Sequence, residues 1–246
     1  MNIDQARFNM VEQQIRTWEV LDQEVLNLLF EVRREEYLPA SATSLAFVDM
    51  EIPLGHGEVM LSPKLEARML QELQVKSTDR VFEIGTGSGY MTALLASRSA
   101  FVDSVEIVPE LAAFAAKNLA IHGIDNVNLQ VGDAVRGWPA DFRAGAEGKP
   151  QAALKNKGAG GNRHFDQAQA GLFDVILLTG STPVLAPALL AMLAPGGRLL
   201  AVIGDAPVMK ATLFTAAGRG EVASVELFET CIPKLRNAPQ PQRFVF

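Results

Sequence analysis

The stretch VFEIGTGSGY, residues Val81 to Tyr90, passes in one step from apolar residues to closely spaced glycines. Such a change is typical of a buried strand that turns into a helix whose first backbone amides face a ligand. The glycines are Gly85, Gly87 and Gly89, in the spacing Gly-x-Gly-x-Gly. A dinucleotide fingerprint needs its last glycine one residue later, where this chain has Tyr90. The turn therefore favours a ligand other than a dinucleotide.

Three carboxylates accompany the turn and the two strands that follow it. Glu83 precedes the turn, where it would repel a pyrophosphate but would help to hold an ammonium group, directly or through water. Glu106 and Asp133 end the next two strands, where they can accept hydrogen bonds from ribose hydroxyls and from an adenine amino group. S-adenosylmethionine carries an ammonium and no phosphate, so the pattern predicts it as the cofactor. A glycine turn that binds nothing is the alternative.

Strand-like and helix-like runs alternate through the rest of the chain. Five short β-rich runs are separated by runs with helical periodicity that open or close with Pro or Gly. The predicted strands lie at 80–84, 101–107, 126–131, 173–179 and 197–203, and the predicted helices at 90–98, 109–123 and 183–197. Alternation of this kind predicts an α/β, Rossmann-like, mostly parallel sheet with helices on both faces. Residues 221–233 and 243–246 are predicted as late strands, one of them an antiparallel edge.

The whole chain, residues 1–246, is expected to be a single domain, since its length is marginal for two. Residues 1–75 should supply helices and a loop on the substrate side, with residues 4 to 40 helical and Asp22 capping the second helix. Residues 76–246 should supply the cofactor-binding sheet. Residues 143–171 interrupt it with a polar, Gly-rich and Ala-rich segment, which predicts a disordered insertion or a substrate-facing lid.

Composition excludes several classes of protein. The net charge of −6 and the pI of about 5.2 argue against a broad nucleic-acid surface. Cys231 is the single cysteine, so no internal disulfide forms, and the scattered histidines predict no metal site. No secretory signal and no membrane-spanning run are recognisable. We expect a soluble cytoplasmic protein that binds neither membranes nor nucleic acid. The sequence does not determine the oligomeric state, and a monomer is favoured.

The sequence resembles the protein-L-isoaspartate O-methyltransferase family. The matching stretches are MVEQQIR, VRREEYLP, AFVDMEIPLGHGEVMLSP, VFEIGTGSGYMTALLA, VEIVPELAAFAAKNL, VGDAVRGWP, FDVILLTGS and LLAMLAPGGRLLAVIG, which run in order from Met10 to Gly204. The resemblance implies a seven-stranded sheet, S-adenosylmethionine as cofactor, and as methyl acceptor the isoaspartyl carboxylate of damaged proteins. With the turn and strand-end reasoning it gives the predicted cofactor contacts, which are Glu83, Gly85, Thr86, Gly87, Ser88, Gly89, Glu106, Ile107, Gly132, Asp133, Ala134 and Thr179.

One loop departs from the family's pattern, in which Gly-x-Gly is followed by Gln-Thr-Ile-Ser. Glu58 stands at the Gln, Val59 at the Thr and Leu61 at the Ser, so both hydroxyls are missing. Ser62 comes one residue late and is expected to cap the helix that Pro63 begins, with a shifted catalytic hydroxyl as the alternative. The usual apolar final strand also appears here as CIPKL.

The loop that contains Glu58, Val59 and Leu61 allows more than one interpretation of the chemistry. A carboxylate acceptor is ionised at neutral pH and needs no base, so an apolar pocket from Val59, Met60 and Leu61 could serve it. A small-molecule acceptor with a phenol or enol would need a base, for which His56 and Glu58 are the nearby candidates. The hypotheses about function are an isoaspartyl methyltransferase, a small-molecule O-methyltransferase on the same scaffold, and a protein that binds the cofactor without peptide methylation.

Overall fold

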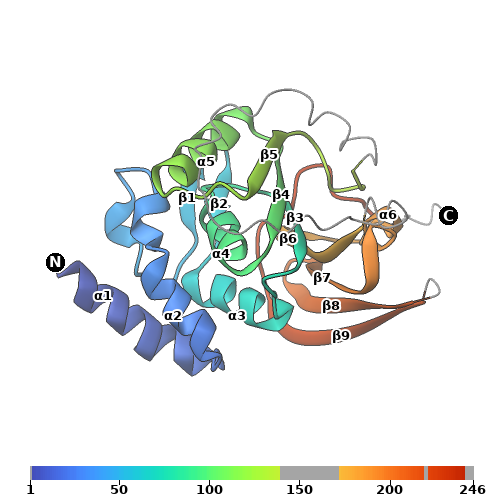
Figure 1. The fold of residues 1–246 in the computed structure, drawn as a ribbon, viewed down its shortest axis with the longest axis horizontal. Helices are drawn as coiled ribbons and strands as arrows, with labels where there is room; N and C mark the ends of the chain where they lie inside the picture. Colours follow the sequence, from blue (N-terminus) through green and yellow to red (C-terminus); the bar gives the residue numbers. More distant parts are fainter. Residues whose placement is uncertain (1, 139–171, 219–220, 242–246) are drawn as a thin grey trace, which may run out of the picture.

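The computed structural model describes residues 2–138, 172–218 and 221–241 (Figure 1). The insertion predicted at residues 143–171 and the strand predicted at residues 243–246 lie outside the described residues. The glycine turn and the strands predicted between residues 80 and 203 all lie within them.

A seven-stranded sheet in the order β5-β4-β3-β6-β7-β8-β9 forms the centre of the described structure. Its first five strands pair in parallel, and the last two are antiparallel. The strands are β3 (Arg80–Ile84), β4 (Phe101–Glu106), β5 (Val127–Val131), β6 (Phe173–Thr182), β7 (Leu193–Asp205), β8 (Val208–Gly218) and β9 (Glu221–Thr230). The predicted mostly parallel sheet with an antiparallel edge is therefore confirmed.

The apolar core is divided by the sheet, because alternate residues of a strand face opposite sides. Val81 and Val175 belong to the larger cluster, which also takes in side chains of helices and of residues 10–29, whereas Phe82 and Ile176 belong to a smaller cluster on the other face. The helices beside the sheet that contribute to the larger cluster are α3 (Pro63–Leu73), α4 (Tyr90–Arg98) and α5 (Pro109–Ile121). The predictions of α4 and α5 are confirmed. No helix within the described ranges has the length and apolar character needed to cross a bilayer.

The helix predicted at residues 183–197 is wrong for most of its length. The structure has only α6 (Pro187–Leu190) there, and β7 already begins at Leu193. Gly196 has a φ of +78°, and a Cβ on Gly197 would lie 2.8 Å from the carbonyl oxygen of Ala194. Both geometries belong to the irregular start of β7, where its register with β6 shifts between Leu193 and Arg198. Pro195 also lacks the amide hydrogen that a continuing helix would need.

The antiparallel edge is built differently from the prediction. Strand β8, to which the sequence pattern assigned no strand, pairs with β7 on one side and with β9 on the other. Its pairing with β7 runs without a shift from Asp205 opposite Val208 to Arg198 opposite Thr215. The long pairing with β7, rather than local propensity, stabilises residues 208–215 as a strand, although they include Ala and Thr.

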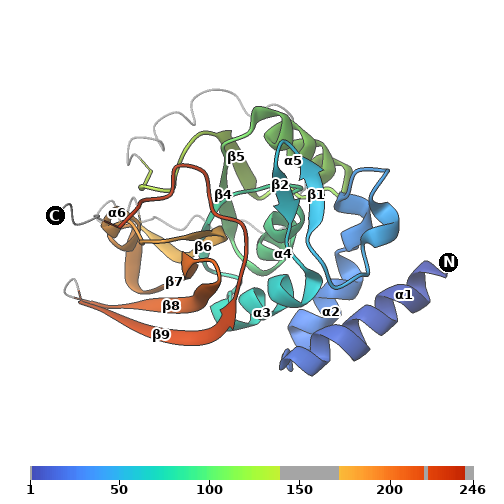
Figure 2. The ribbon, with the colours of Figure 1, turned by 180° about the vertical axis from the view of Figure 1, so that it is seen from behind.

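The N-terminal segment packs against one end of the sheet's helices and lies at the opposite end of the molecule from the β8–β9 hairpin (Figures 1 and 2). It contains α1 (Ile3–Asn9), α2 (Gln23–Glu31) and short turns of other helix types at 10–18, 34–37 and 43–45. The side chain of Asp22 accepts hydrogen bonds from the amides of Glu24 and Val25, at 2.8 and 3.4 Å, so the predicted cap is confirmed. A two-stranded hairpin of β1 (Ile52–Gly55) and β2 (Glu58–Met60) follows.

A buried guanidinium joins the N-terminal segment to the hairpin and to the sheet's helices. Arg34 is almost completely buried and forms an ion pair with the equally buried Glu66 on α3. It also donates hydrogen bonds to the carbonyl oxygens of Ala46, at 3.1 Å, and Leu61, at 2.5 Å. Its guanidinium carbon lies 5.4 Å from the centre of the Tyr90 ring, at the start of α4. Burial raises the pKa of Glu66 to about 7, and the nearby Arg34 charge opposes that rise.

We expect Arg34→Met to lower the free energy of unfolding by about 3–5 kcal/mol at pH 8, because it leaves the Glu66 carboxylate buried without its partner. The loss should be smaller at pH 5, where Glu66 can take up a proton. Urea denaturation at the two pH values measures both quantities.

Arg33→Met is the matched control, since the neighbouring Arg33 forms only an exposed ion pair with Glu36, at 3.4 Å. Its effect should stay within about 0.5 kcal/mol. Equal effects of the two substitutions would show that the buried ion pair does not hold these segments together.

Candidate functional site

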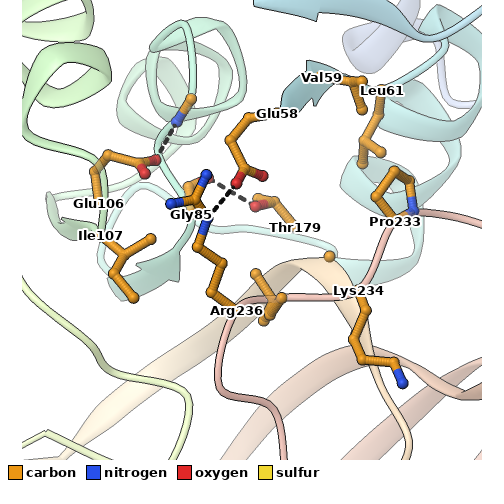
Figure 3. Close-up of a pocket in the computed structure, with 13 residues that line it drawn as sticks. Glu58, Val59, Leu61, Gly85, Glu106, Ile107, Thr179, Pro233, Lys234 and Arg236 are labelled. Carbon is orange, nitrogen blue, oxygen red and sulfur yellow. Dashed lines mark hydrogen bonds and ion pairs between the residues drawn. The ribbon is translucent and has the colours of Figure 1, made fainter. Parts of the chain in front are cut away.

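A cleft opens at the carboxyl ends of β3, β4 and β6, the edge at which open α/β sheets bind their ligands (Figure 3). Its cavity volume is about 70 Å³, and the space that includes its open mouth is about 530 Å³. Its walls come from the glycine turn, the end of β4, β6, the β1–β2 hairpin and the segment that follows β9. The lining residues are Glu58, Val59, Leu61, Gly85, Gly87, Glu106, Ile107, Thr179, Gly180, Pro233, Lys234, Leu235 and Arg236.

The glycine turn presents bare backbone to the cleft. Gly85, Gly87 and Gly89 have φ angles of +96°, +56° and +84°, a region that other residues rarely adopt. A Cβ on Gly85 would lie 2.3 Å from the hydroxyl oxygen of Thr179. That hydroxyl lies 3.0 Å from the carbonyl oxygen of Ile84 and 2.7 Å from that of Gly85, and it can donate to either. Thr179, predicted as a cofactor contact, therefore fixes the shape of the turn and lines the cleft.

The Glu106 carboxylate lies at the floor of the cleft and is held by backbone amides. One of its oxygens accepts a hydrogen bond from the amide of Gly87, at 2.8 Å, and the other accepts from the amide of Val108, at 2.9 Å. Only 3% of the residue is exposed, and it lines the cleft beside Ile107. Two oriented lone-pair regions remain on such a carboxylate, which suits a ligand with neighbouring hydroxyls.

An apolar extension of the cleft leads to the end of β5. Val105, Ile107, Ala134 and Val135 line it, and Gly132 and Asp133 stand at its edge. Asp133 is exposed, and its two oxygens accept hydrogen bonds from the amide of Val135, at 3.2 Å, and from the Asn237 side chain, at 2.8 Å. A slot with apolar walls and a carboxylate at its rim can take a flat heterocycle that carries an amino group.

The Trp138 ring does not line this slot but packs on Gly132, where an added Cβ would lie 2.4 Å from it. The indole therefore packs against the turn that follows β5. A glycine at residue 132 is required because the indole approaches the backbone directly.

Thr86 and Ser88, also predicted as cofactor contacts, are buried and line a smaller cavity next to the cleft. Ser88 accepts a hydrogen bond from the amide of Tyr90, at 3.3 Å. Glu66 lines the same cavity, so the buried Arg34–Glu66 pair lies next to the turn. The cavity and the cleft share the lining residues Val59, Leu61, Gly85, Gly87 and Thr179. Contacts of Thr86 and Ser88 with the cofactor stay a prediction.

Glu83 lies inside the protein and does not reach the cleft. It is fully buried, and one of its oxygens accepts hydrogen bonds from the Thr92 and Ser104 hydroxyls, at 2.5 and 2.6 Å. Because Ser104 donates its single hydrogen there, it must accept from Thr86, 2.6 Å away. Burial raises the pKa of Glu83 to about 8, and the two hydroxyls oppose that rise. The predicted direct contact with an ammonium group is therefore wrong for this structure, because the strand places the side chain in the core. A contact through water stays a prediction.

The β1–β2 hairpin forms the outer wall of the cleft and carries the departures from the family's loop. Val59 and Leu61 both line the cleft, as predicted. Glu58, one of the two candidate bases, lies in an ion pair with Arg236, at 2.6 Å. His56, the other, is exposed at the tip of the hairpin with a φ of +56°, and its side chain is not part of the cleft wall.

Ser62 stands at the N-cap position of α3, but its hydroxyl makes no capping hydrogen bond. Only its carbonyl serves the helix, accepting from the amides of Leu65 and Glu66, at 3.1 and 3.2 Å. The residue lines a separate cavity that also contains Trp18 and Phe228. The structure thus gives Ser62 the predicted position, without the predicted bond, and keeps it out of the cleft.

The segment that follows β9 supplies part of the cleft that the sequence pattern did not predict. The amide of Ser181 donates to the carbonyl oxygen of Pro233, and the amide of Leu235 donates to that of Ser181, both at 2.9 Å. These bonds bring Lys234 and Arg236 to the mouth of the cleft. In the sequence only the unusual run CIPKL indicated that this segment differs from the family's pattern. Its contact with the cleft could not be predicted, because Ser181 of β6, to which it is bound, lies about fifty residues earlier in the chain.

Comparisons with known proteins agree with this geometry. The family model described as protein-L-isoaspartate(D-aspartate) O-methyltransferase matches residues 5–144. A protein-L-isoaspartate O-methyltransferase of Anaeromyxobacter sp. (strain Fw109-5) is 37% identical over 190 residues, 76% of this chain and 76% of that protein. One of Methanoculleus marisnigri is 34% identical over 198 residues, 80% of this chain and 77% of that protein.

Among solved structures, the fold is similar to that of a Plasmodium falciparum protein assigned as a protein-L-isoaspartate O-methyltransferase and crystallised with S-adenosyl-L-homocysteine. The TM-score is 0.69 and the sequence identity 21%, over 93% of this chain and 97% of the other. At this identity the match supports the fold.

We expect stability to fall as the pH rises from about 5 to about 8, in part because of Glu83. In the folded protein the pKa of Glu83 is raised by burial to about 8, whereas the ordinary pKa of a glutamate in an unfolded chain is 4.5. Between these values the folded state binds more protons, so the free energy of unfolding decreases with increasing pH. Glu83→Gln should make this slope shallower by roughly 1 kcal/mol per pH unit near pH 6. Glu66 should leave a residual slope.

Urea denaturation across this pH range measures the slope. Glu110→Gln, which removes an exposed carboxyl from the first turn of α5, is the control and should leave it unchanged. A slope in Glu83→Gln as steep as in the unaltered protein would contradict a protonated Glu83.

Proposed function

The chain belongs to the protein-L-isoaspartate O-methyltransferase family, and from this premise we propose that it methylates the free carboxylate of isoaspartyl residues in damaged proteins, as the first step of their repair. S-adenosylmethionine supplies the methyl group, which it carries on a sulfonium sulfur. The model of the family covers residues 5–144, and relatives at 34–37% identity match about three quarters of the chain.

One observation carries the cofactor assignment, which is that the glycine turn and the ends of β4 and β5 line two adjoining cavities. Gly85, Ile107 and Arg236 line both of them, so the two cavities lie side by side. The Glu106 carboxylate can accept from two ribose hydroxyls, and the apolar slot beside Asp133 can hold an adenine ring. Such a set of residues fits a nucleoside without a phosphate.

The other wall of the cleft supports a carboxylate as methyl acceptor. Val59, Leu61 and Pro233 make an apolar wall next to the glycine turn. An acceptor that is already ionised needs no base, and opposite charges that vanish together in the transition state react faster in a dry pocket. These side chains orient the acceptor and exclude water, which is what an in-line displacement requires of a protein.

The hypothesis of a small-molecule acceptor is not supported by the residues that line the cleft. A phenol or enol must lose a proton to a base within hydrogen-bond reach. Glu58 is engaged by Arg236 and His56 does not line the cleft, so the two candidate bases are not placed for that work. The structure therefore favours an acceptor that arrives ionised.

The remaining expectations complete the proposal. The acceptor is an isoaspartyl-containing peptide or protein, and the enzyme acts as a cytoplasmic monomer that needs no nucleic acid or membrane. The acidic net charge of −6 supports the expectation about nucleic acid. Residues 1–246 act as a single domain in this proposal.

The purified protein should transfer labelled methyl groups from S-adenosylmethionine to a peptide with one isoaspartyl residue, and not to the same peptide with a normal aspartyl residue. The product should be a base-labile methyl ester, because the acceptor is a carboxylate. Scintillation counting before and after treatment with base measures it. If both peptides are unlabelled while S-adenosylhomocysteine binds, the protein is a cofactor-binding module or has another acceptor.

We expect Glu106→Ala to weaken S-adenosylhomocysteine about 10-fold to 100-fold, because hydrogen bonds to a charged carboxylate contribute about 1.5–3 kcal/mol. Glu110→Ala, four residues further on and exposed, should leave the affinity unchanged. Titration calorimetry measures both, with the melting temperature as a check on folding. Unaltered affinity in Glu106→Ala would remove this carboxylate from the cofactor site.

A further inference from the structure

Two segments far apart in the sequence meet across the mouth of the cleft through one arginine. The Nε of Arg236 donates to a carboxylate oxygen of Glu58, at 2.6 Å, and an Nη donates to the carbonyl oxygen of His56, at 2.5 Å. Figure 3 shows the Arg236 and Glu58 side chains pointing toward one another, whereas Lys234 points away. Lys234 instead pairs with Asp205, at 2.6 Å. Arg236 is thus the cation that closes the cleft toward the hairpin.

Arg236 lies beside both halves of the proposed nucleoside site. It lines the section that contains Glu58 and Glu106, and it also lines the apolar slot with Ile107 and Asp133. Its side chain is 45% exposed and that of Glu58 is 28% exposed, so the pair sits at the boundary between cleft and solvent. A planar guanidinium in this position can cover a heterocycle or a ribose from the open side.

The hairpin tip depends on such a contact for its position. Gly55, His56 and Gly57 have consecutive positive φ angles of +91°, +56° and +83°. A Cβ on either glycine would meet nothing within 4 Å, so the tip stands clear of neighbouring side chains. The hydrogen bond from Arg236 to the His56 carbonyl therefore sets the distance between the tip and the segment that follows β9.

The negative charge of Glu58 has its own effect on the cleft, because it neutralises the Arg236 guanidinium. A guanidinium keeps its positive charge at all ordinary pH values, and the cofactor's sulfonium is also positive. Two like charges in a partly closed cleft repel one another more strongly than in water. The Glu58 carboxylate balances the guanidinium, so the pair presents little net charge to the cofactor.

We propose that Arg236 and Glu58 form a positioning pair that covers the cofactor, in which Arg236 provides the cover and Glu58 cancels the charge that would otherwise repel the sulfonium. The inference rests on the proposed function, since it presupposes that the cleft binds S-adenosylmethionine. It assigns to Glu58 a role in preventing the cleft from favouring the uncharged thioether product over the positively charged cofactor.

Titration calorimetry with S-adenosylmethionine and with S-adenosylhomocysteine tests the proposal on four proteins. These are the unaltered protein, Glu58→Gln, Arg236→Met and the double variant. The ratio of the two dissociation constants is the decisive readout, because a loss of structure alone would change both constants together. Glu226→Gln is the matched control, since Glu226 forms an ion pair of the same kind with Lys210, at 2.5 Å, between β8 and β9.

In Glu58→Gln the uncompensated guanidinium should weaken S-adenosylmethionine about threefold to tenfold more than S-adenosylhomocysteine. Arg236→Met should weaken S-adenosylhomocysteine by about threefold to fivefold, because the cover is lost. It should weaken S-adenosylmethionine less, because the unpaired Glu58 carboxylate attracts the sulfonium. The double variant should return to the ratio of the unaltered protein. The control should leave both constants within twofold of their original values.

An unchanged ratio in Glu58→Gln would overturn the charge-balancing role, and unchanged affinities in Arg236→Met would overturn the cover. In both cases the unaltered protein still binds the nucleosides, so the proposed function stands. If the unaltered protein binds neither compound, the proposed function itself is overturned, together with the inference that rests on it.

Discussion

The Arg34 guanidinium is the contact on which the arrangement of the cleft depends. It binds the end of the hairpin through the Leu61 carbonyl, α3 through Glu66, and the loop before the hairpin through the Ala46 carbonyl. At the other end of the hairpin, a second guanidinium binds the tip from the opposite side, through Glu58 and the His56 carbonyl. The Arg34 guanidinium is buried, whereas the Arg236 side chain is 45% exposed. The β1–β2 hairpin is therefore held more firmly at its base than at its tip.

The three carboxylates of the turn and strand ends occupy three different environments. Glu83 is buried, with its pKa raised to about 8, and belongs to a chain of hydroxyls inside the core. Glu106 is buried but is satisfied by two backbone amides. Asp133 is exposed and pairs with the Asn237 side chain. Similar residues at similar positions in the sequence therefore do different work, because the depth of each strand end in the protein differs.

Sequence patterns predicted those parts of the molecule that local rules determine. The strands at 80–84 and 101–106, the helices α4 and α5, the glycine turn and the Asp22 cap all follow from periodicity and from residue chemistry within a short window. Three features did not follow. The helix at 183–197 failed because an apolar run with Pro and Gly suits a strand as well as a helix. Strand β8 was missed because its pairing with β7 decides its conformation. The burial of Glu83 was missed because period-two alternation does not tell the two faces of a strand apart when both are covered.

The site shows the same division. The residues contributed by the turn and by β4 and β6 were predicted, because motif spacing fixes them. Arg236 was not, since its position depends on a return of the chain to Ser181 that no local pattern encodes.

The closing contact of the cleft joins residues that are 178 positions apart in the chain. The contact is partly exposed, with 45% of the Arg236 side chain open to solvent, and contacts of this kind open at lower cost than those of the core. Binding competence and global stability are consequently separable properties of this protein. If the segment that follows β9 separated from Ser181, the sheet would stay intact and the melting curve would not change. The cleft, however, would then be open to solvent. Hydrogen exchange at the Ser181 and Leu235 amides, rather than thermal denaturation, reports whether a given molecule is ready to bind.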